Sequence, residues 1–140
     1  MSEAVREVPK KQRPEFRNIH ITELSNYRLP TAALVSILHR ISGFGMFLLL
    51  PFILYLFELS VRSEMSFARF AGVVSHPLAK LIILGLVWAY FQHFCAGVRH
   101  LFMDLHLGLD KESAKKSATT VLVISLVLTA LVGLKLFGVF

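Results

Sequence analysis

The sequence has a single cysteine, Cys95, among its 140 residues. One thiol excludes a disulfide within the chain and a cysteine-rich metal cluster. Acidic residues are also few, with 9 Asp and Glu against 15 Lys and Arg, and all charged residues together make up only 17% of the chain. A glycine-rich nucleotide-binding loop is missing as well. These absences argue against an enzyme that is complete in this one chain, and we expect no catalytic residue in it.

The first thirty residues lack the apolar core and the small-residue cleavage site of a signal peptide. Four glutamates interrupt their basic character, which is unlike a mitochondrial presequence: Glu3, Glu7, Glu15 and Glu23. We therefore expect residues 1–30 to form a basic N-terminal arm and the chain to lie in a bacterial inner membrane, with a mitochondrial inner membrane less favoured.

The remaining chain is dominated by apolar residues, which give the whole sequence a hydrophobic content of 55% and a mean hydropathy of +0.64. A membrane-spanning helix needs about 20 mostly apolar residues. Three segments meet this requirement, roughly 31–59, 78–105 and 119–137. Pro51 lies inside the first segment and predicts a kink there. The sequence thus predicts an all-α fold, a three-helix membrane bundle formed by residues 31–140.

Basic residues concentrate on one side of this predicted topology. The N-terminal arm and the second connection together carry nine basic residues, six and three: Arg6, Lys10, Lys11, Arg13, Arg17, Arg28, Lys111, Lys115 and Lys116. The first connection and the tail together carry three, two and one: Arg62, Arg69 and Lys135. Because cytoplasmic loops carry the excess of Lys and Arg, we expect a cytoplasmic N-terminus and an external C-terminus. This distribution indicates contact with membrane lipid and no nucleic-acid partner.

The second segment carries a polar stripe near its end. His93, Gly97, His100 and Asp104 follow the i, i+4, i+7, i+11 spacing of one helix face. At ~1.5 Å per residue, His93 lies about 18 Å from the end of the segment, deep in the membrane. A neutral imidazole beside a glycine gap suits a haem iron and its flat macrocycle, with Arg99, His100 and Asp104 nearer the surface where the propionates would lie. The alternatives are hydrogen bonds between packed helices and a proton relay.

A second stripe lies at the start of the first segment, in "SILHRISG". Ser36, His39, Arg40 and Gly43 share a helix face. On insertion scales an arginine costs at least ~2.5 kcal/mol at the centre of a span and somewhat less nearer the interface. A partner, snorkelling or a function must offset this cost. One reading is that Arg40 snorkels to the surface. The other is a pocket for a small polar head with an apolar tail, such as a quinone.

These patterns resemble one known family. "RPEF", "LPTAALVSILHRISG" and "HFCAGVRHLFMD" together are similar to the cytochrome b membrane-anchor subunit of succinate dehydrogenase, respiratory complex II. The resemblance implies one haem b, with His93 as an axial iron ligand and the second ligand supplied by a second membrane-anchor subunit. It implies that Ser36 and Arg40 line the ubiquinone site. It also implies that His39 lies close to both the quinone and a haem propionate, and that His100 neighbours a propionate.

The resemblance further implies that electrons arrive from a flavoprotein subunit through an iron–sulfur subunit on the cytoplasmic side. The leading hypothesis is therefore a haem-bearing, quinone-binding subunit of a succinate:quinone oxidoreductase. The rival hypothesis is a structural anchor that holds a soluble enzyme at the membrane without a cofactor of its own.

Overall fold

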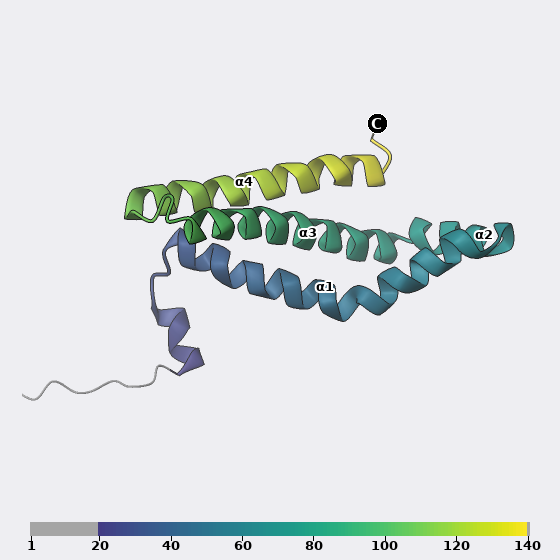
Figure 1. Ribbon diagram of the computed structural model, residues 1–140. Coiled ribbons are helices and arrows are strands. Elements are labelled where there is room, and N and C mark those ends of the chain that lie inside the picture. Colours follow the sequence, from purple (N-terminus) through teal and green to yellow (C-terminus); the bar gives the residue numbers. More distant parts are fainter. Residues whose placement is uncertain (1–19, 140) are drawn as a thin grey trace, which may run out of the picture.

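The computed structural model describes residues 20–139, and all regular structure in this range is helical (Figure 1). Three of its α-helices, the first, third and fourth, are long and apolar enough to cross a membrane, which confirms the predicted all-α fold with three spans. Most of the predicted N-terminal arm lies outside the described residues. The elements are the 3-10 helix η1 (Ile21–Asn26) and the α-helices α1 (Thr31–Arg62), α2 (Glu64–Ser75), α3 (Pro77–Asp104) and α4 (Lys111–Leu136).

Prolines mark the start and the middle of α1. Pro30 has an extended backbone (φ −65°, ψ 152°) and its carbonyl accepts the N–H groups of Ala33 and Leu34, so the helix begins directly after it. Pro51 lies inside α1. Its ring cannot donate a backbone hydrogen bond and crowds the preceding turn, which bends helices. The ribbon of α1 changes direction near its middle, as expected (Figure 1).

The connection between the first two spans is itself helical, which the sequence analysis did not predict. The helix α2 starts at a reciprocal cap, in which the Ser63 hydroxyl accepts the Ser66 N–H at 3.1 Å and the Ser66 hydroxyl accepts the Ser63 N–H at 2.9 Å. A second cap at His76, whose ring accepts the Leu78 N–H at 3.2 Å, starts α3 with Pro77 in its first turn.

The helix α4 begins at Lys111, well before the apolar stretch predicted from residue 119. It follows a tight turn in which His106 (φ 61°) and Gly108 (φ 69°) adopt left-handed conformations. Asp110 caps the helix by accepting the Ser113 N–H at 2.9 Å. Hydrogen bonds from the Ser113 hydroxyl and backbone hold the pKa of Asp110 below its ordinary value. The carboxylate therefore stays charged beside the positive end of the helix dipole.

The helix α3 lies between α1 and α4 and contacts both, while α1 also contacts α4. Small side chains at the contacts allow the helices to approach closely, as is typical of membrane bundles. The core at these contacts consists of Val35, Ala96, Ala118 and Val121. A buried hydrogen bond from the Ser125 hydroxyl to Gln92 Oε1, at 2.9 Å, joins α4 to α3.

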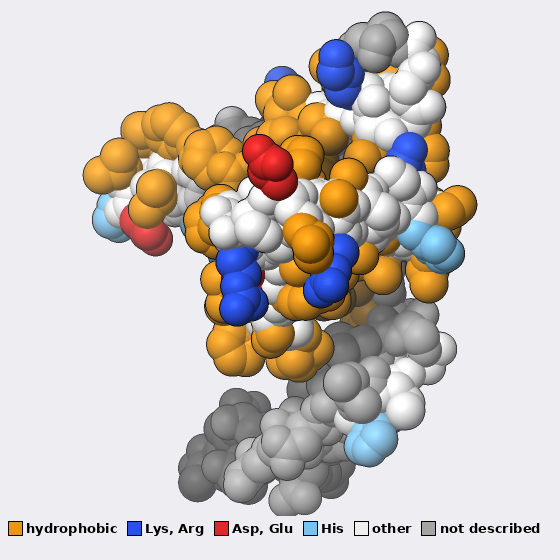
Figure 2. All heavy atoms as spheres, turned by 90° about the vertical axis from the view of Figure 1, so that its right-hand side faces the viewer, with side chains coloured by type: hydrophobic (Ala, Val, Ile, Leu, Met, Phe, Trp, Pro, Cys, Tyr) orange, Lys and Arg blue, Asp and Glu red, His pale blue; other side chains and the backbone are white. Residues whose placement is uncertain are grey.

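Large apolar side chains cover the outside of the bundle. Phe44, Phe47, Leu101 and Leu126 are each more than half exposed. Seen from the end formed by α2, the surface is mostly hydrophobic with isolated charged side chains (Figure 2). Such a surface is unsuited to water and suits contact with lipid.

The start of α1, the end of α3 and the start of α4 lie at one end of the bundle (Figure 1). We predict that this end faces the cytoplasm, because the excess of basic residues is found there. Reporter fusions after Lys116 and at Phe140 should then give opposite readouts, cytoplasmic after Lys116 and external at Phe140. The same readout at both positions would contradict the three-span topology, because α4 would then not cross the membrane.

Candidate functional site

Three histidines from the two polar stripes meet where α1 crosses α3. The His39 ring of α1 stacks on the His93 ring of α3, with ring centroids 4.0 Å apart and planes inclined by 13°. The His39 ring also contacts His100, with centroids 4.9 Å apart and planes inclined by 48°. The two stripes, separated by more than fifty residues in the sequence, therefore form one polar site inside an apolar bundle.

The backbone of α1 determines which nitrogen of His93 carries its proton. The Nδ1 atom lies 2.9 Å from the backbone carbonyl oxygen of His39. A carbonyl oxygen can only accept a hydrogen bond, so Nδ1 must carry a proton, and in the neutral ring the lone pair is then on Nε2. The buried Ser42 hydroxyl donates to the same carbonyl at 2.9 Å and lies 3.4 Å from Nδ1. The hydrogen bond thus orients the ring, and Nε2 is the nitrogen that a neutral His93 would offer as a ligand.

A glycine on α1 makes room for the His93 ring. A Cβ atom at Gly43 would lie 2.8 Å from Cε1 and 3.1 Å from Nδ1 of His93. These distances are shorter than van der Waals contact, so any larger residue would push the ring away. Gly43 therefore allows the close helix approach on which the Nδ1 hydrogen bond depends.

The sequence predicts an open gap on α3 at Gly97, but in the structure this gap is filled. The nearest atom to a Cβ built at Gly97 is Nε2 of His39, at 3.6 Å. Gly97 thus accommodates the imidazole of α1. About one turn after Gly97 on α3, His100 Nδ1 is buried without a hydrogen-bond partner among residues 20–139. A buried ring nitrogen without a partner is costly, which makes His100 a candidate for contact with a bound group.

Arg99 points away from the three histidines, although it is next to His100 in the sequence. Its side chain points to α4, where Nε donates to the Ser117 hydroxyl at 3.0 Å and an Nη nitrogen to the Ala114 carbonyl at 3.4 Å. The reason is geometric: adjacent residues on a helix point about 100° apart, so Arg99 faces a different neighbour from His100. Asp104 is exposed at the end of α3.

Ser36 and Arg40 lie one turn apart near the start of α1. Ser36 is partly buried and Arg40 is exposed. Neither side chain has a hydrogen-bond partner within residues 20–139. Their hydroxyl and guanidinium groups are thus free to bind a ligand, or a headgroup at the membrane surface.

The three histidines are arranged as stacked rings and not as a set of ligands around one ion. Within the described part of the chain, no group of three or more His, Cys, Asp or Glu side chains is placed to hold a metal ion. A metal held here would thus take at most part of its ligands from residues 20–139.

Comparison with known proteins decides the family. Residues 10–132 match the family model described as the succinate dehydrogenase/fumarate reductase transmembrane subunit. The chain belongs to this family. Members with similar sequences are succinate dehydrogenase cytochrome b556 subunits. The Paracoccus denitrificans protein is 39% identical over 108 residues, which cover 77% of this chain and 83% of the relative. The Coxiella burnetii protein is 36% identical over 112 residues, which cover 79% and 90%.

The family match confirms the resemblance seen in the two polar stripes, and it makes this chain a membrane subunit of an enzyme complex. The bacterial relatives are named succinate dehydrogenase cytochrome b556 subunits.

The sequence pattern alone did not identify Ser42 as part of the site, although a Ser-Gly pair opposite a histidine is a signal for close helix contact. It also missed the buried pair of Gln92 and Ser125, because its partners come from different helices.

Proposed function

We propose that this chain is the haem b-bearing, quinone-binding anchor of a succinate:quinone oxidoreductase. In this proposal His93 Nε2 would hold the haem iron, and a second membrane-anchor subunit would supply the other protein ligand. The observation that carries it is the hydrogen bond between His93 Nδ1 and the His39 carbonyl. Histidine ligands of metals characteristically donate their other ring N–H to a carbonyl or carboxylate, which orients the ring and raises its basicity.

The haem would supply one-electron redox chemistry close to the quinone. This chain would contribute the ligand, its orientation and an apolar surrounding. His39 contacts both His93 and His100, and His39 and His100 would each offer a ring N–H to a propionate. Since His100 Nδ1 has no partner in the described chain, it is the better placed of the two to gain a hydrogen bond from a bound group.

Ubiquinone would bind at Ser36 and Arg40. A quinone head presents two carbonyl oxygens that accept hydrogen bonds, and its isoprenoid tail remains in lipid. The serine hydroxyl and the guanidinium are donors on one face of α1, and both are free of partners in the described chain. Arg40 would hold the oxygen where negative charge develops during reduction.

The remaining steps belong to other subunits. Electrons would come from succinate through the flavoprotein and the iron–sulfur subunit, which would dock at the end of the bundle that carries Ser36 and Arg40. We place the complex in a bacterial inner membrane, as suggested by its bacterial relatives and the three apolar helices. This chain alone would oxidise no succinate.

An absorption spectrum of the purified complex tests this function. The reduced-minus-oxidised spectrum of the wild-type complex should show b-type haem bands, and quinone should be reduced when succinate is added. A complex that assembles at the membrane and turns over succinate without a b-type spectrum would support the rival function, a cofactor-free structural anchor.

Gly43 offers a test of the haem position within this chain. Gly43→Ala should displace the His93 ring, because the added Cβ would lie 2.8 Å from Cε1. We expect a loss of haem from the purified complex or a clearly altered low-spin signal. Gly45→Ala is the matched control: it lies on the same helix and nothing lies within 4 Å of its Cβ position. Equal haem content and spectra in both variants would contradict the placement.

A further inference from the structure

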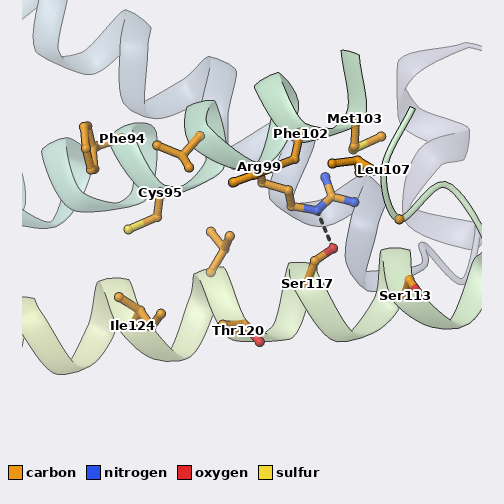
Figure 3. Close-up of a pocket in the computed structure, with 13 residues that line it drawn as sticks. Phe94, Cys95, Arg99, Phe102, Met103, Leu107, Ser113, Ser117, Thr120 and Ile124 are labelled. Carbon is orange, nitrogen blue, oxygen red and sulfur yellow. Dashed lines mark hydrogen bonds between the residues drawn. The ribbon is translucent and has the colours of Figure 1, made fainter. Parts of the chain in front are cut away.

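A second polar feature lies on the α3 and α4 side of the bundle, away from the histidines. The Arg99 side chain enters a cavity of about 550 Å³ between these helices, near the turn that joins them (Figure 3). Arg99 is only 6% exposed. The rest of the cavity wall is mostly apolar, with Phe94, Val98 and Phe102 from α3 and Val121 and Ile124 from α4.

The charge of Arg99 is not neutralised within the described chain. Its two hydrogen bonds, to the Ser117 hydroxyl and the Ala114 carbonyl, go to uncharged groups. The Glu112 carboxylate, in the first turn of α4, pairs with Lys116 at 2.7 Å. A guanidinium carries more N–H donors than these two bonds use. A buried cation without a counter-ion is costly in a membrane, and it favours an anion beside it.

The surroundings favour an anion that carries an acyl chain. Phe94, Phe102 and Ile124 are exposed on the outside of the two spans, so the cavity opens onto the apolar outer surface of the bundle. The adjoining hollow shares Thr120 and Ile124 with this cavity. Its charged lining residues are Glu112 and Lys116, which pair with each other, and Lys115, which adds positive charge on the same side. Basic pockets between membrane helices near the surface bind anionic lipid headgroups.

We propose that this cavity is a binding site for an anionic phospholipid. The phosphate would accept hydrogen bonds from the free N–H groups of Arg99, and Lys115 would lie close enough to add to the field. One acyl chain would follow the apolar wall formed by Phe94, Val98 and Ile124. Arg–phosphate contacts of this kind are short, directional and charge-assisted. The site is independent of the haem and quinone assignments.

Photo-crosslinking tests the proposal. The affinity-tagged chain, in native membranes with the subunits that remain bound, is labelled with phosphatidylglycerol that carries a diazirine on its acyl chain. Labelled peptides should come from α3 near Phe94–Phe102 and from α4 near Thr120–Ile124. Phosphatidylcholine with the same diazirine should label these peptides about tenfold less, the low end of what a charged hydrogen bond contributes to affinity.

Two variants separate the charge from the shape of the site. Arg99→Gln should reduce the phosphatidylglycerol label about tenfold for the same reason. Because Arg99 also joins α3 to α4, Ile124→Trp serves as a second variant that fills the cavity and leaves Arg99 in place. Leu131→Trp, on an exposed part of α4, is its matched control and should label as the wild type does.

The proposal is overturned if phosphatidylglycerol and phosphatidylcholine label the residues of the cavity equally, or if Ile124→Trp is labelled as strongly as Leu131→Trp. It is also overturned if no label reaches these segments, which is the result expected when a neighbouring subunit's carboxylate covers Arg99. Haem spectra and quinone turnover measured on the same samples show separately whether the proposed function holds.

Discussion

Replacing His93 by alanine is expected to abolish the low-spin b-type haem signal of the assembled complex. The imidazole Nε2 is the only group that we assign to the iron from this chain, and its ring is held by the His39 carbonyl at 2.9 Å. Without this nitrogen the iron would lose one of its two axial ligands. Reduced-minus-oxidised absorption spectra and the electron paramagnetic resonance of the haem measure the loss, which should be close to complete.

Two further variants make this result specific. His100→Ala should leave the bis-histidine signal in place and change it only modestly, since His100 is placed beside the site and not on the iron. His106→Asn, in the exposed turn after α3, should behave as the wild type does. An unchanged low-spin signal in His93→Ala, together with its loss in His100→Ala, would move the ligand to His100.

Arg40→Leu should impair quinone reduction far more than it impairs assembly. Leucine keeps the bulk and suits lipid but removes the donors. Hydrogen bonds to a charged group are worth ~1.5–3 kcal/mol. At ~1.4 kcal/mol per decade, the efficiency of quinone reduction at limiting quinone should fall about 10- to 150-fold. Ser36→Ala should act in the same direction more weakly, because it removes a hydrogen bond between uncharged groups.

The control for Arg40→Leu is electron transfer from succinate to an artificial acceptor that accepts electrons before the membrane subunits. This activity should survive, because flavin and iron–sulfur chemistry belong to other chains. Arg62→Leu, at the far end of α1 where Arg62 pairs with Glu58 at 3.2 Å, should leave quinone reduction normal. Normal quinone turnover in Arg40→Leu would show that Arg40 only snorkels to the membrane surface, and it would remove both residues from the site.

The three spans could be predicted because hydropathy and length are properties of each segment alone. The helix α2 could not, since it has only 12 residues. Its cap uses Ser66 where the recognisable capping box has Glu or Gln, so the sequence carried only part of that start signal. The early start of α4 was missed for a related reason. Its first turns are charged and lie outside the apolar stretch, yet Asp110 caps them as part of one continuous helix.

The two polar stripes could be predicted from helical spacing, but their mutual packing could not. Spacing places His93, His100 and Gly97 on one face of α3, and it cannot say that His39 of α1 stacks there. Arg99 shows the same limit. Its position follows from the sequence, while its contact with Ser117 depends on where α4 lies. Side chains that serve contacts between helices are thus the part of the site that only the tertiary structure reveals.

The most direct test of the account is an experimental structure of the assembled complex that resolves the side chains of α1 and α3. The account predicts haem iron bound by Nε2 of His93, with Nδ1 of the same ring hydrogen-bonded to the His39 carbonyl as it is here. Iron bound by another residue of this chain, iron bound by Nδ1, or a complex whose His93 faces no haem would contradict it.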